Sequence, residues 1–408
     1  MAQYLGPIFG TGKDGYLTVS GTQNINTRTG ASGTAGNRTL TVDSISGFSS
    51  GDLVMIHKSR GETTTTCGSW ELNRLYTAPS GNTLYIDVPL TYNYQDSGND
   101  QSQVVKVPEY LGVLVSSSTY ITPTAWDGST GGITIFCCNG KTIINSGGGI
   151  TANGGAGAQA TSGNGGGCGT GGGFRGGAAS WGRDNNYGSQ GYWGEGTGGD
   201  KTSKTPSANG NGGGGGTHNN SAVGNAGAGG GGSNGGNGTA GQGGAQGGGG
   251  TYGSTSGNSA LSYVTFGGAG AGGGGGYNYS SDEAGGGGAG GGIIIIMSKI
   301  FINSGSVISN GGNGGPTNVW ADGSGGGGGA GGSILIKSQN ATLGSSIITA
   351  TGGDGGHDNG GEHRTRVGGI GGDGRVRIEA NNLTGSTSPT YSSYGTLVPW
   401  AGGIGIMG

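Results

Sequence analysis

The chain has 408 residues, of which 112 are glycine, while 30% are hydrophobic and 10% are charged. So few apolar side chains exclude a single large hydrophobic core. A formal net charge of −3 gives no electrostatic basis for binding nucleic acid, which requires a basic patch.

Residues 1–130 have an ordinary composition and predict a small β domain. Short runs rich in β-branched and aromatic residues, bounded by Gly, Ser and Asp, are typical of strands, and no amphipathic helix is evident. The strand-like runs are residues 16–19, 39–42, 53–56, 84–88 and 104–107. We interpret this domain as a platform on which the rest of the chain is mounted.

Residues 131–380 combine apolar strands with glycine-rich sequence. A glycine pair followed by an apolar strand occurs at Ile133, Ile293 and Ile334, and a truncated copy occurs at Val376. Ile293 and Ile334 are 41 residues apart, and Val376 follows 42 residues later. Such a period indicates stacked units, each of which buries its apolar face on the next. We therefore expect β-solenoid-like strand layers from which the glycine segments leave and to which they return.

The glycine runs predict either disordered coil or an ordered bundle. Apolar strands between the runs argue against disorder, because exposed strands of this kind aggregate. A polyproline-II chain makes no internal hydrogen bonds, and neighbouring copies can bond to each other only where no Cβ stands between them. We therefore expect a polyglycine-II bundle. The predicted fold is all-β, with an N-terminal β domain followed by solenoid-like repeats that carry this bundle.

Clusters of aromatic, polar and charged residues interrupt the glycine runs. Such side chains do not fit between close-packed glycine backbones, so we expect them in turns at the ends of the bundle. Exposed aromatic and Arg side chains on supported loops are common anchors for binding, and aromatic rings with Asn and Asp also suit sugars. The alternative is that each aromatic merely covers the bundle end. The candidate receptor-binding residues are Trp181, Arg183, Tyr187, Tyr192, Trp193, His218, Tyr277, Tyr279, Trp320, His357, His363 and Arg364.

Catalytic and metal motifs are weak. His357, Asp358, Glu362 and His363 lie close together, but their spacing matches no metal motif, and a solvated polar loop is the simpler interpretation. The neighbouring acids Asp282–Glu283 lie inside a glycine tract and form no convincing acid/base pair. The four cysteines have neither zinc spacing nor a disulfide framework. We expect no catalytic residue, no metal and no cofactor, and therefore no enzyme.

Two features concern export and the C-terminal region. The first residues show no basic region followed by an apolar stretch, and no apolar run reaches the length of a transmembrane helix. We therefore expect a protein that does not leave the cell by the general secretory route. Residues 381–408 are rich in Ser, Thr and Gly and are interpreted as a final strand or a tail.

The long glycine runs interrupted by aromatic and polar loops resemble the glycine-rich distal tail-fibre adhesins of T-even-like bacteriophages. This resemblance covers about residues 130–380 and lies in architecture and composition. It implies a polyglycine-II sandwich whose tip loops bind an outer-membrane protein or a surface glycan of the host. It also implies a virion location and contacts with other tail-fibre or virion proteins.

Three functions follow as expectations. The favoured one is a tail-fibre or tail-tip adhesin that binds a bacterial receptor and no nucleic acid. The alternative is a structural virion or cell-surface protein, a decoration or filament subunit without a specific receptor, for which a homo-oligomer is an open expectation. A glycan-degrading tail enzyme ranks last because no paired carboxylates are evident.

Overall fold

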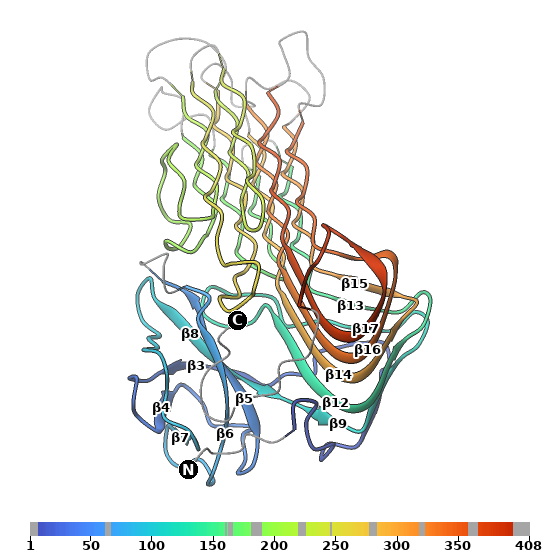
Figure 1. Cartoon of the computed structure of the whole chain (residues 1–408). Helices are drawn as coiled ribbons and strands as arrows, with labels where there is room; N and C mark the ends of the chain where they lie inside the picture. Colours follow the sequence, from blue (N-terminus) through green and yellow to red (C-terminus); the bar gives the residue numbers. More distant parts are fainter. Residues whose placement is uncertain are drawn as a thin grey trace.

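The computed structural model describes residues 7–61, 67–159, 161, 166–180, 190–218, 226–244, 247–276, 284–317, 323–357 and 366–394. These residues form strands and no helix, which confirms the all-β prediction. Within these ranges, no helix has the length and apolar character needed to cross a membrane. Figure 1 shows two sheets in the lower part of the view and glycine-rich segments that run upward from them.

An antiparallel sheet of six strands, here called the platform, forms within the first 110 residues. Its strands are β3 (Arg28–Ser32), β4 (Thr39–Val42), β5 (Leu53–Arg60), β6 (Trp70–Arg74), β7 (Thr83–Tyr85) and β8 (Gln101–Val107). They lie in the order β6-β5-β8-β3-β4-β7. Alternating side chains point to opposite faces, so Val54 and Ile56 enter a core inside the platform, whereas Met55 enters a second core beyond it.

The second sheet has twelve strands, and all its pairs are parallel. The early members are β1 (Tyr16–Thr18), β2 (Thr22–Gln23), β9 (Glu109–Tyr110), β10 (Gly112–Val115), β11 (Tyr120–Ile121), β12 (Ile133–Ile144) and β13 (Gly149–Thr151). The later members are β14 (Ile293–Asn303), β15 (Ser306–Ile308), β16 (Ser333–Thr349), β17 (Arg375–Ser388) and β18 (Ser392–Tyr394). Strands from both sides of residue 130 therefore share this sheet.

This parallel sheet curls because one long strand serves two parts of it. The order is β1-β10-β12-β14-β16-β15-β13-β11-β2, with β17 beside β16, β18 beside β17 and β9 beside β12. The start of β16 pairs with β14, whereas its last residues pair with β15. Figure 1 shows the long strands bending at the right of the view, with β13 and β15 above them.

The repeat strands recognised in the sequence pair directly with one another. Ile133 lies opposite Ile293, so the long interval between them adds no strand to this ladder among the described residues. Ile294, and not Ile293, lies opposite Ile334, which in turn lies opposite Val376. The register that aligned Ile293 with Ile334 is therefore wrong by one residue.

Both faces of the long parallel strands are buried, as is common in parallel sheets. Ile294, Ile334 and Val376 point into a core inside the curl. Ile293 and Leu335 point into the core shared with the platform. The adjacent Cys137 and Cys138 enter opposite cores, which confirms the prediction that they face opposite sides of a strand.

The described glycine-rich segments between residues 152 and 374, here called the glycine block, are joined by backbone hydrogen bonds. Six consecutive N–H groups, from Gly286 to Gly291, donate to three neighbouring segments in rotation. The acceptors are the carbonyls of Ala158, Gly177 and Gly327 for the first three donors, and of Gly155, Phe174 and Ala330 for the next three. The same neighbour therefore recurs at every third residue.

Close backbone approach explains why these positions are glycine. A Cβ on Gly326 would lie closer than 3.0 Å to the backbone of Gly286, and a Cβ on Gly368 would meet the backbone of Gly326 in the same way. Real Cβ atoms do not approach other atoms so closely. The segments can therefore exchange hydrogen bonds at these positions only because no side chain intervenes.

Candidate functional site

The described glycine segments end together at the side of the block away from the platform, in a set of residues here called the distal layer. The layer consists of Gln159, Ser180, Thr217, His218, Gly275, Ala284, Thr317, Ser324, His357 and Arg366. Gly275 N donates to Ser180 Oγ (3.1 Å), and Ser324 Oγ donates to the Gly274 carbonyl (3.1 Å). Thr317 N donates to the His357 carbonyl (3.1 Å). Segments that are far apart in sequence therefore begin and end within one layer.

The distal layer flanks most of the candidate receptor-binding residues. The chain leaves and re-enters the layer on either side of residues 181–189, 219–225, 277–283, 318–322 and 358–365. Eight of the twelve candidates lie outside the described residues: Trp181, Arg183, Tyr187, Tyr277, Tyr279, Trp320, His363 and Arg364. Of the other four, His218 is buried in the layer and His357 is exposed there.

Tyr192 and Trp193 are half-buried on a flank of the glycine block, just below the distal layer. Their neighbour Gly191 donates to the carbonyl of Gly216, two residues before His218. The Lys204 ammonium lies over the Tyr192 ring, 4.9 Å from its centroid, which is a cation–π geometry. These two aromatics therefore come near His218, although they do not lie in the layer itself.

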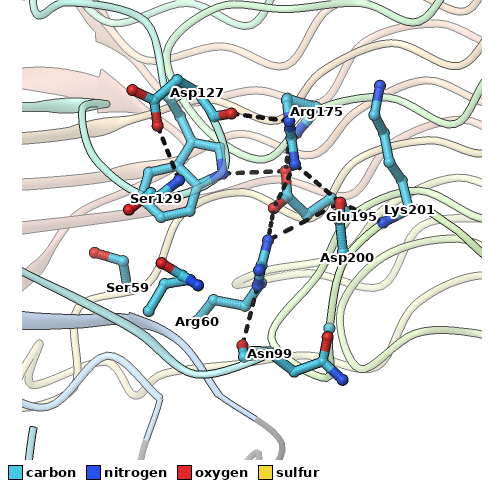
Figure 2. A network of polar contacts seen from close by, with 12 residues as sticks. Ser59, Arg60, Asn99, Asp127, Ser129, Arg175, Glu195, Asp200 and Lys201 are labelled. Atoms are coloured by element: carbon cyan, nitrogen blue, oxygen red, sulfur yellow. Dashed lines mark hydrogen bonds and ion pairs between the residues drawn. The ribbon is translucent and has the colours of Figure 1, made fainter. Parts of the chain in front are cut away.

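A buried polar network joins the glycine block to the platform (Figure 2). Glu195 in the block is fully buried and forms an ion pair with Arg60 at the end of β5. Its second carboxylate oxygen accepts from Arg175 Nε (2.9 Å) and from Trp126 Nε1 (3.0 Å). Arg175 also pairs with Asp200 (2.9 Å). We call this set the junction network.

The junction network leaves its groups no freedom for acid/base chemistry. Burial by itself lowers the pKa of Arg175, but the Glu195 carboxylate, followed by Asp200, outweighs it and raises that pKa. Both Glu195 oxygens are held by cationic or N–H donors. A buried carboxylate is tolerated only when it is paired in this way. The arrangement suits a fixed joint between two parts of the fold.

Aromatic packing and a buried histidine reinforce this joint. Phe266 in the glycine block packs against Trp126, with ring centroids 5.2 Å apart, and against Phe174 at 5.3 Å. His57 on β5 donates from Nε2 to the Val264 carbonyl (2.8 Å). Complete burial lowers the pKa of His57 to about 4, so this imidazole is neutral near pH 7.

Sequence reasoning did not identify the junction network. Glu195 and Arg60 are 135 positions apart, and neither belongs to a motif. The available signal was weak: Glu195 is one of the few acidic residues in a long glycine tract, and Arg175 precedes it by 20 positions.

No group of three His, Cys, Asp or Glu residues within the described ranges could hold a metal ion. Of the polar cluster considered in the sequence, only His357 is described, because Asp358, Glu362 and His363 lie outside those ranges. The pair Asp282–Glu283 lies outside them as well.

Comparisons with models of protein families, with curated proteins and with solved structures found no match for this chain. The class that the fold and the site define is an all-β protein in which a platform and a curled parallel sheet carry a hydrogen-bonded glycine block.

Proposed function

We propose that this chain is a bacteriophage tail-fibre or tail-tip adhesin that binds a receptor on the host bacterial surface. The observation that carries the proposal is the distal layer, where segments that flank five aromatic or charged stretches are hydrogen-bonded together. A layer of this kind would present several recognition stretches to one surface. The receptor would be an outer-membrane protein or a surface glycan, and the platform would attach to other tail-fibre or virion proteins.

The proposal includes a polyglycine-II bundle as the pedestal. A polyproline-II chain has three residues per turn, so successive N–H groups point to three different neighbours. The rotation of acceptors between Gly286 and Gly291 supports this assignment. In the same way, the direct pairing of β12, β14, β16 and β17 supports a short solenoid-like stack at the base of the bundle.

Rigid attachment of the pedestal adds support. A binding surface loses less conformational entropy on contact when its loops are held in advance. The buried Glu195 pairs and the aromatic contacts of Phe266 hold the glycine block against the platform. Such a joint suits a role in binding and gives no support to catalysis.

Adsorption of the purified protein to candidate host bacteria tests the proposal. We expect labelled protein to bind the host, to compete with phage adsorption, and to lose binding when Trp181, Tyr192 and Trp193 are replaced together by alanine. The matched control replaces Tyr16 and Tyr76, which are 79% and 55% exposed on the β1 edge and the platform, and should retain binding. Unchanged binding by the triple variant, with its fold intact by circular dichroism, would remove these residues as the contact.

A structural role without a receptor is the second candidate, and an open sheet edge favours it. β18 pairs with β17 only at residues 377–379, so residues 380–388 have a partner strand on one side only among the described residues. An edge of this kind can pair with a second chain. Fibres that lengthen with protein concentration in electron micrographs, together with no host binding, would favour this role.

A further inference from the structure

The thiol of Cys168 and the ammonium of Lys201 are in direct contact. Lys201 Nζ lies 2.6 Å from Cys168 Sγ, and both residues are half-buried. Among the described residues, Lys201 makes no ion pair with a carboxylate, although its backbone N–H donates to Asp200 Oδ1 (2.7 Å). The sulfur is therefore the one side-chain partner recorded for this ammonium.

The other three cysteines are unlike Cys168. Cys67, Cys137 and Cys138 are buried in the cores. Burial raises the pKa of the Cys67 thiol to about 12, and it also raises that of Cys137. Buried thiols without a cation are inert, whereas an accessible sulfur beside a cation is the usual target of peroxide. The chain therefore holds one candidate for oxidation and three internal controls.

We propose that Cys168 and Lys201 form a covalent sulfur–nitrogen cross-link when the protein meets hydrogen peroxide. In the first step, the Cys168 sulfur attacks one peroxide oxygen and the oxygen–oxygen bond breaks. The departing hydroxide takes a proton from the Lys201 ammonium and leaves as water. The products are a sulfenic acid and a neutral amine in contact with each other.

In the second step, the Lys201 nitrogen attacks the oxidised sulfur. The hydroxyl group leaves with one amine proton as a second water, and a sulfenamide bond joins Sγ to Nζ. Sulfenic acids condense with nearby thiols and nitrogens in this way. Sulfur is oxidised by two electrons, one peroxide is reduced to two waters, and no other reactant is needed.

The cross-link would fasten the start of the 200–209 turn to the glycine block. Asp200, the residue before Lys201, already pairs with Arg175 of the junction network. A covalent bond at Lys201 closes a loop that begins at Cys168, 33 positions earlier, and restricts the unfolded chain. This inference does not depend on the proposed adhesin function, because it uses only the chemistry of this pair.

Peptide mapping of the full-length protein tests the inference. Reduced protein is treated with a small excess of hydrogen peroxide, digested, and analysed by mass spectrometry. We expect the peptides that contain Cys168 and Lys201 to be joined, with a mass two hydrogens below their sum, and to separate again with dithiothreitol. The oxidised protein should also melt several degrees higher than the reduced protein.

Two lysine variants make the test specific. Lys201→Arg keeps the charge but should give no joined peptide and no rise in melting temperature. Lys204→Arg, which alters the neighbouring lysine over Tyr192, should behave as the parent protein does. Recovery of Cys168 as a free thiol or a sulfinic acid, with Lys201 unmodified in the parent protein, would overturn the inference.

Discussion

Replacing Gly326 by alanine tests whether the glycine block is held by close backbone approach. The added Cβ would meet the carbonyl of Gly286 well inside contact distance, and that neighbour is backbone that cannot rotate away. The segment around Gly326 would have to shift by roughly 1 Å to restore an ordinary contact. Gly326 N donates to the Gly315 carbonyl (3.1 Å), and Gly356 N donates to the Gly326 carbonyl (2.8 Å).

The expected cost follows from these contacts. A shift of this size breaks or weakens both hydrogen bonds, each with a net value of about 0.5–1.5 kcal/mol. Overpacking adds about 1–3 kcal/mol, and the lower entropy of the unfolded alanine chain returns about 0.4–1 kcal/mol. We therefore expect Gly326→Ala to lower the free energy of unfolding by about 3 kcal/mol.

Gly167 provides the matched control for this experiment. A Cβ at Gly167 would meet only the Cβ of Ala158, at an ordinary 3.8 Å. We expect Gly167→Ala to be neutral or to stabilise the protein by up to about 1 kcal/mol. The measurement is urea unfolding followed by tryptophan fluorescence. Equal midpoints for the two variants would refute the argument that absent side chains hold the block together.

Three further predictions concern charged groups. Glu195→Gln leaves Arg60 and Arg175 without their buried carboxylate and should cost about 3–5 kcal/mol in urea unfolding, whereas Asp14→Asn, at a surface pair, should cost under about 1 kcal/mol. Because the folded pKa of His57 lies below its unfolded value of about 6.5, about 3 kcal/mol of stability should be lost as pH falls from 6.5 to 4, and a His57→Gln variant that unfolds with the same pH dependence would contradict this. Burial, with nearby Asp43, raises the pKa of Asp96 to about 6, so stability is lost as pH rises from about 4 to 6; Asp96→Asn should stabilise the protein by about 1–2 kcal/mol at pH 7, after allowance for solvent screening, but not at pH 4, as measured by thermal unfolding at both pH values.

Local strand signals were strong enough to predict the elements of this fold. The runs at residues 53–56 and 104–107 became β5 and β8, and the apolar repeats became β12, β14, β16 and β17. The exact pairing was not accessible. Ile293–Ile296 presents the same side chain at every position, and both faces of this strand are buried, so alternation could not reveal which residue lies opposite Ile334.

The candidate site was predictable only where composition signals it. Aromatic and charged clusters mark the breaks between glycine runs, and the described residues beside five of them meet in the distal layer. The junction network has no comparable signal. Arg60 lies on a platform strand and Glu195 in a glycine tract, and their pairing depends on how the whole chain folds back on itself.

The rotation of hydrogen-bond partners at every third residue restricts how the length of the glycine block can change. Inserting one residue into the run at 286–291 would turn each later N–H group toward the wrong neighbour, by a third of a turn. Inserting three residues would keep every orientation and lengthen that segment by about 9 Å. Variants of this chain with a taller or shorter block should therefore differ by whole triplets within each run, with unequal additions absorbed between the runs.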